Sequence, residues 1–211
     1  MLPTSGIPPL AHWRGVWRAL GATVDDALYH EVLARYQAPD RHYHTTQHLE
    51  EMFALWPLVE PLARHGAEVQ AAIWFHDAVF DVTRSDNESR SAEWVRAALL
   101  AGGAREVVAA RVHSLVMETR HDGEPERADA QALVDLDLAI LGADPVRFDQ
   151  YEHQVRAEYA IVPVTEFRAR RREMLERFLA RPRIFSTAPL YALREEQARE
   201  NLSRSVARLS A

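Results

Sequence analysis

A histidine–aspartate pair stands inside the most apolar stretch of this sequence. In "AAIWFHDAVF", His76 and Asp77 are flanked by alanine, isoleucine, tryptophan, phenylalanine and valine. A buried carboxylate is costly unless it is paired or bound to a metal ion, and no arginine stands nearby in the sequence to neutralise it. A divalent cation would meet that need, and the neighbouring imidazole would supply a second ligand. The pair therefore indicates a metal site.

A further ligand candidate stands in "RHYHTTQHLEEM", where three histidines fall within seven residues. His48 lies one turn before Met52 and so borders the apolar face of the expected helix. A lone histidine in such a place is most simply a partly buried, hydrogen-bonded side chain. His44 lies one turn before His48 and can share its face, whereas His42 precedes the helix start and is expected in a loop.

Two aspartates interrupt another apolar stretch, "LVDLDLAIL". On a helix, Asp135 and Asp137 would point about 200° apart, so one of them is expected to face the interior. The periodicity does not choose between them. Either could instead cap a helix or pair with one of the 25 arginines, and we expect that structural role for the less buried of the two.

The amino-acid composition excludes cysteine and lysine from any functional site and leaves histidine, aspartate and glutamate as metal ligands. The 211 residues include no cysteine, which excludes a disulfide scaffold, a thiolate metal site and a cysteine nucleophile. No lysine is present either, so a cation that contacts phosphate must be a guanidinium. The net charge of −6 gives no global reason to bind a nucleic-acid polymer or a membrane. No secretion signal or membrane span is recognisable, and a cytoplasmic protein is expected.

These residues must be positioned by helices, because strand signals are almost lacking and amphipathic stretches follow one another. We predict an all-α fold, a single-domain helical bundle of about nine or ten helices over residues 1–211. Its core would span about 23–142, with C-terminal helices over about 144–211 packing on it. The expected helices cover 10–20, 23–37, from 45 or 46 to the prolines at 57 and 61, 66–80, 85–103, 104–120, 128–142, 145–161, and two more that begin at 164 and about 189.

Local signals mark where several of these helices begin. Thr23 or Asp25 can cap the second helix. Ser85 and Glu88 have the spacing of a capping box. Asp144 is followed by a proline, which suits the first turn of a helix.

In order, the pattern is a histidine, a histidine–aspartate pair and a late aspartate, each on a separate helix, and it resembles the HD-domain superfamily of metal-dependent phosphohydrolases. "QHLEEM", "FHDAVFD" and "DLDLAILG" resemble its motifs. "YHTTQH", "HDAVFDVTRSDNESRSAEW", "VRAEYA" and "EQARENL" are similar to a bacterial subfamily of predicted HD phosphohydrolases. The resemblance covers about Tyr36 to Asn201.

The resemblance implies a ligand set and a reaction. The implied metal ligands are His48, His76, Asp77 and Asp137, with Asp135 as a neighbour. Two histidines and two aspartates suit one divalent ion, or two, and Mn, Fe, Co, Ni, Mg and Zn are all compatible. The implied enzyme is a metal-dependent phosphohydrolase that acts on a nucleotide or another small phosphoester or pyrophosphate.

Other residues have expected roles around the metal. Asp77 and Glu88 are the catalytic candidates, because Asp77 could bridge to a second metal or accept the proton of the water, and an acidic residue placed like Glu88 commonly faces the site in HD proteins. Expected contacts with the substrate come from His44, Arg41, His121 and Arg156.

Two alternatives stay open. Some HD-fold proteins hold two irons and act as oxygenases, which would need further ligands such as His44, His113 or His121. A sensor that binds metal or nucleotide without turnover would keep the same ligand set.

Overall fold

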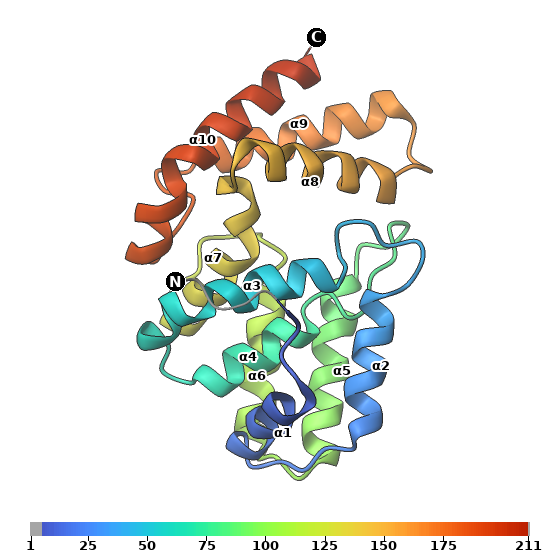
Figure 1. The fold of residues 1–211 in the computed structure, drawn as a ribbon, viewed down its shortest axis with the longest axis vertical. Helices are drawn as coiled ribbons and strands as arrows, with labels where there is room; N and C mark the ends of the chain where they lie inside the picture. The colour runs from blue at the N-terminus through green and yellow to red at the C-terminus, as the bar shows by residue number, and fades with distance from the viewer. Residues whose placement is uncertain (1–5, 211) are drawn as a thin grey trace. The chain divides into compact units, whose positions relative to one another are not determined.

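The structure, a computed structural model, describes residues 6–210, and this part of the chain is all-α (Figure 1). The predicted fold class is therefore confirmed. Residues 6–210 contain ten α-helices and two short 3-10 helices and no strand. In chain order these are α1 (Leu10–Ala19), α2 (Asp26–Tyr36), α3 (Thr46–Val59), η1 (Glu60–Leu62), α4 (Gly66–Phe75), α5 (Asn87–Ala101), α6 (Glu106–Glu118), α7 (Ala128–Leu138), η2 (Ala139–Gly142), α8 (Pro145–Glu158), α9 (Val164–Ala180) and α10 (Ala188–Ser210).

The chain divides into two compact units, with the boundary between Val134 and Asp135. Helix α7 is continuous across this boundary. The first unit holds α1 to α6 and most of α7, and the second holds the last turn of α7, η2 and α8 to α10. The single domain expected from the sequence stays a prediction. None of the helices within residues 6–210 has the length and apolar character needed to cross a membrane.

Helix α4 is the centre of the first unit and packs against α1, α3, α5 and α6 (Figure 1). Nearly every side chain from Val69 to Phe75 is buried. Trp74 lies edge-on to Trp13 of α1, with ring centroids 5.3 Å apart, and Tyr29 of α2 packs against both rings. Burial of such large aromatic side chains is a major part of the free energy that holds α4 in place. The residues that follow Phe75 therefore leave the helix from a fixed point.

Several predicted helix starts are confirmed. Asp25 caps α2 by accepting a hydrogen bond from the backbone N–H of Ala27. Thr45 caps α3 in the same way through Gln47. Asp144 accepts from two backbone N–H groups at the start of α8, and Pro145 occupies the first turn. Capping side chains replace the intrahelical partners that these N–H groups lack.

Helix α3 runs through Pro57 and ends at Val59, between the two prolines expected to end it. Two other expectations are wrong. The helix predicted over 66–80 ends at Phe75, so Asp77 stands in the turn after α4 rather than within it. The predicted capping box is absent, because α5 begins at Asn87 and its N-cap, Asp86, makes no side-chain capping bond. Tertiary packing overrides local start and stop signals at these places.

The second unit is built around α10, which packs against α9 and η2. Gly142 of η2 makes a close approach possible, because a Cβ at this position would lie 2.4 Å from the backbone oxygen of Arg194. The amide of Asn201 donates to the carbonyls of Leu141 and Ala143, 2.9 and 2.8 Å away. These contacts hold η2 tightly against α10.

Candidate metal centre

The predicted histidine–aspartate pair stands at the C-terminal end of α4. His76 is the C-cap residue, and its Nδ1 lies 2.9 Å from the carbonyl oxygen of Ile73. A carbonyl only accepts, so Nδ1 carries the proton and Nε2 presents a lone pair. A helix end thereby fixes both the direction and the tautomer of the imidazole. Metal-binding histidines are commonly held in this way.

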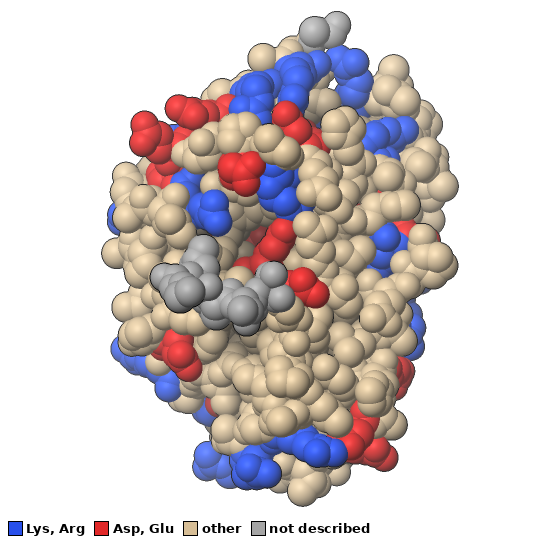
Figure 2. Space-filling view, viewed as in Figure 1, with Lys and Arg blue, Asp and Glu red and all other residues tan. Residues whose placement is uncertain are grey.

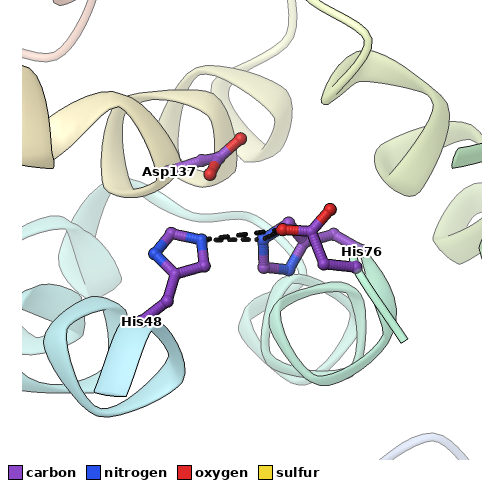
Figure 3. Close-up of side chains that lie close together, drawn as sticks. His48, His76 and Asp137 are labelled. Atoms are coloured by element: carbon purple, nitrogen blue, oxygen red, sulfur yellow. Dashed lines mark hydrogen bonds and ion pairs between the residues drawn. The ribbon is translucent and has the colours of Figure 1, made fainter. Parts of the chain in front are cut away.

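His48 meets His76 from the N-terminal turn of α3 (Figure 3). The two Nε2 atoms lie 3.0 Å apart, and both side chains are buried. The Nδ1 of His48 lies 3.1 Å from the hydroxyl of Tyr43. Two ligands at about 2.1 Å from one ion and about 90° apart would stand about 3.0 Å from each other. The spacing of the two imidazoles therefore fits a shared metal ion.

Asp77 adds a carboxylate to the two imidazoles. Its Oδ2 lies 3.0 Å from Nε2 of His76 and 3.8 Å from Nε2 of His48. The side chain keeps 16% of its surface exposed, so the site is open enough for water or a small ligand to reach it. Two neutral imidazoles and one carboxylate form an N/O donor set that suits divalent first-row metals.

Asp137, the fourth residue of the predicted ligand set, lies in the last turn of α7 and belongs to the second unit. The other three residues, His48, His76 and Asp77, all belong to the first unit, and each offers one ligand atom. This group could hold a metal ion. A role for Asp137 as a further ligand stays a prediction.

Asp135 has a structural role, as one of the two aspartates was expected to have. The expectation that this would be the less buried of the two is wrong. Asp135 is fully buried, whereas Asp137 is half-buried. Its carboxylate accepts from the backbone N–H groups of Ser186 and Thr187, 2.9 and 2.6 Å away, and from the hydroxyl of Thr187. It thus anchors the segment that enters α10. A carboxylate can be fully buried when hydrogen-bond donors satisfy its oxygens, as they do here.

Glu88, the predicted second catalytic residue, lies in the first turn of α5. Its pKa is raised above the ordinary value, mainly by burial and further by the nearby Asp77 carboxylate. A carboxyl with a raised pKa can hold or exchange a proton nearer to neutral pH. Glu88 therefore belongs to the electrostatic surroundings of Asp77, and its catalytic role stays a prediction.

His44 and His121 were expected to face the substrate. His44 Nε2 lies 3.9 Å from Oδ2 of Asp77, and its ring packs on Phe80 with centroids 4.2 Å apart. His121 follows α6 in a left-handed conformation, φ 55°, which is uncommon outside glycine. The electrostatic effect of His121 lowers the pKa of Glu88, against the larger effect of burial. His44 thus lies beside a candidate ligand and His121 near Glu88, while His113 pairs with Glu93 at 3.2 Å.

The two arginines expected at the substrate are both engaged with backbone carbonyls. Arg41 is buried and donates to the carbonyls that follow α4. Arg156, in the second unit, donates to the carbonyls of Tyr159 and Val162 and lies over the ring of Phe167. Contact of either arginine with a substrate stays a prediction. Figure 2 shows basic side chains interspersed with acidic ones on the face in view.

Two tyrosines beside the ligands were not among the residues predicted for the site. Tyr43 contacts Nδ1 of His48, and Tyr36 bonds to the backbone at Asp77. Both precede α3, one at the end of α2 and one in the loop, and neither interrupts an apolar pattern. They stand five residues before and two residues after Arg41. This spacing could not identify them, because only the tertiary structure brings α2 against the end of α4.

Comparison of the chain with protein-family models, with curated proteins and with solved structures finds no match in any of the three.

Proposed function

We propose that this chain is a metal-dependent phosphohydrolase that acts on a small phosphorylated substrate, such as a nucleotide or another phosphoester or pyrophosphate. One observation carries the proposal: Nε2 of His48, Nε2 of His76 and Oδ2 of Asp77 converge within 3.8 Å of one another. Asp137 is the proposed fourth ligand. The order of these residues along the chain, which resembles the HD-domain pattern, supports the reaction class.

The donor set supports a hard or borderline divalent ion. Two neutral imidazoles and two carboxylates give the site a formal charge of −2, which such an ion would neutralise, and they leave coordination positions for water and a phosphoryl oxygen. A divalent ion held there supplies an activated water and polarises the phosphorus centre. The surrounding residues would act by positioning and by electrostatics, without a covalent enzyme intermediate.

The proposed roles of the side chains follow from their contacts. His76 and His48 are held by Ile73 and Tyr43 so that both Nε2 atoms face the same point. Glu88 would take up the proton of the attacking water as the new P–O bond forms and the ester P–O bond breaks. The leaving oxygen then receives a proton, so that hydrolysis consumes one water and releases an alcohol, or a second phosphate, with phosphate.

The oxygenase alternative needs a second iron and further ligands, for which His44, 3.9 Å from the Asp77 carboxylate, is one candidate. Two irons per chain in the elemental analysis would favour that alternative over hydrolysis. A sensor without turnover would show the same metal binding as a hydrolase, and only an activity measurement separates these two.

The test begins with elemental analysis of the purified protein. A panel of nucleotides, phosphomonoesters and pyrophosphates is then assayed with chelated protein and with each divalent metal added back. We expect hydrolysis that depends on the metal and disappears in Asp77→Ala. His113→Gln, which alters a histidine paired with Glu93 outside the group, is the matched control and should keep full activity. Chelated protein as active as metal-loaded protein would contradict the proposal.

A further inference from the structure

Arg41 bridges the loop that leads into α3, the helix of His48, and the turn after α4 that carries Asp77. It lies in the loop between α2 and α3, and it is buried. One guanidinium nitrogen, Nη1, donates to the carbonyls of His44 and Asp77, 3.1 and 2.7 Å away. The other, Nη2, donates to the carbonyl of Ala78 at 3.1 Å. A single side chain thus ties the segment before α3 to the turn after α4.

The guanidinium is suited to this place in charge and in shape. Backbone carbonyls at a helix C-terminus lack intrahelical partners and carry partial negative charge, which a cation stabilises. The planar group lies over the rings of Tyr36 and Phe80, 5.1 and 5.5 Å from their centroids. Only a rigid fork of N–H donors can reach several carbonyls at once while stacked on a ring, and a lysine ammonium cannot reproduce it.

Tyr36 holds the same turn from the other side. Its hydroxyl donates to the carbonyl of Trp74 and accepts from the backbone N–H of Asp77, each at 3.2 Å. A phenolic hydroxyl is both a donor and an acceptor, so it can make both bonds at once. Both backbone groups of Asp77 are therefore held, its N–H by Tyr36 and its carbonyl by Arg41.

We propose that Tyr36 and Arg41 are positioning residues that set the direction of the Asp77 side chain and keep it in register with His76 and His48. This inference rests on the proposed metal site, since it assigns these residues a role toward an ion that Asp77 would bind. Neither residue is a proposed ligand. Their contacts are to the backbone, so they act through the turn rather than on the substrate.

A purely structural role would lower the stability of the protein without a specific effect on the metal. Tyr29 provides the matched control, because it is also a buried tyrosine that packs on Trp74 and its hydroxyl donates to one backbone carbonyl, that of Pro8. Tyr29→Phe and Tyr36→Phe each remove one hydroxyl oxygen from a buried tyrosine. Only Tyr36→Phe removes a hydrogen bond to the backbone of Asp77.

The experiment compares binding of Mn²⁺ to chelated wild type, Tyr36→Phe, Arg41→Lys and Tyr29→Phe by isothermal titration calorimetry, with thermal unfolding of each chelated protein alongside. Changes in the partners of metal ligands commonly weaken metal binding by about 10- to 100-fold. We expect the Kd of Tyr36→Phe and of Arg41→Lys to rise at least about tenfold, whereas that of Tyr29→Phe stays within about twofold of wild type.

The outcomes separate this inference from the proposed function. Tyr36→Phe and Arg41→Lys proteins that bind Mn²⁺ as tightly as Tyr29→Phe would overturn the positioning role, whatever their unfolding temperatures. A wild type that binds no Mn²⁺ would overturn both proposals. A wild type that binds Mn²⁺ but hydrolyses no phosphoester contradicts only the proposed function, and the Kd ratios still decide the role of Tyr36 and Arg41.

Discussion

The Nε2 atoms of His48 and His76 lie 3.0 Å apart, although the two histidines come from different helices and stand 28 residues apart in the sequence. In each imidazole the opposite nitrogen is held by a neighbour, the Tyr43 hydroxyl for His48 and the Ile73 carbonyl for His76. Because the Nδ1 atom of each imidazole is held by a hydrogen bond, both Nε2 atoms face the same point and form a preorganised pair of ligands.

Replacement of one of these histidines should abolish metal binding with little effect on the fold. We expect His76→Gln to weaken divalent metal binding at least about 100-fold, because the loss of a ligand should cost more than the loss of a ligand's partner. Equilibrium dialysis followed by elemental analysis measures the change. His113→Gln is the control, and equal metal content in the two variants would remove His76 from the ligand set.

Removal of the metal should lower the stability of the protein. An ion that binds only the folded state adds about 2.7 kcal/mol to the free energy of unfolding when its concentration is 100 times its Kd. Thermal unfolding should therefore shift downward on chelation and recover when the metal is returned. The same shift in Asp77→Ala would show that the effect does not come from the proposed site.

The two neighbouring aspartates of α7 should respond in opposite ways. Asp135→Asn replaces a buried carboxylate that accepts three hydrogen bonds near the start of α10, so we expect a loss of about 3 kcal/mol in stability. Its metal affinity should be retained. Asp137→Asn should weaken metal binding with a small change in stability. Urea unfolding and metal titration of both variants measure the contrast, and a reversed pattern would exchange the two assignments.

Glu88 should make the stability of the chelated protein depend on pH. Burial raises the pKa of this carboxyl in the folded state, so the fold favours its protonated form. The stabilising contribution is fully present below the unfolded-state pKa of about 4.3 and is lost as pH rises through the folded-state pKa.

Glu88→Gln removes this titration. Relative to wild type, the variant should gain stability as pH rises above the folded-state pKa of Glu88, and this gain should be absent at pH values below about 4. Denaturant unfolding of chelated protein across this range measures the difference. A difference between variant and wild type that does not change with pH would show that the pKa of Glu88 is the same in both states.

Gly142 should tolerate no side chain. A Cβ there would lie 2.4 Å from the backbone oxygen and 2.7 Å from the Cβ of Arg194, so η2 and α10 would have to move apart. We expect Gly142→Ala to destabilise the protein by about 2 kcal/mol or more, as overpacking of a rigid contact does. Gly123→Ala, where a Cβ meets nothing within 4 Å, is the control for chemical denaturation. Equal denaturation midpoints for Gly142→Ala and Gly123→Ala would show that α10 can move to accommodate the added methyl group at little cost in stability.

The helices themselves were largely predictable from local patterns. Apolar periodicity located every α-helix to within a few residues, and Asp25 and Asp144 marked two helix starts that the structure confirms. Prediction failed where packing competes with local preference. The helix expected to continue to Phe80 ends at Phe75, although Ala78 is still buried and Val79 and Phe80 are half-buried.

By itself, the sequence determined which residues could bind a metal, because histidine and aspartate inside apolar helices need partners whatever the fold. Only the tertiary structure decided how they are used. It placed Asp77 in a turn, assigned Asp135 to the start of α10 and turned Arg41 toward backbone carbonyls. The physical reason is that burial and pairing depend on elements distant in the chain. The spacing of Asp135 and Asp137 cannot reveal that Ser186 and Thr187 supply hydrogen-bond donors to the first of them.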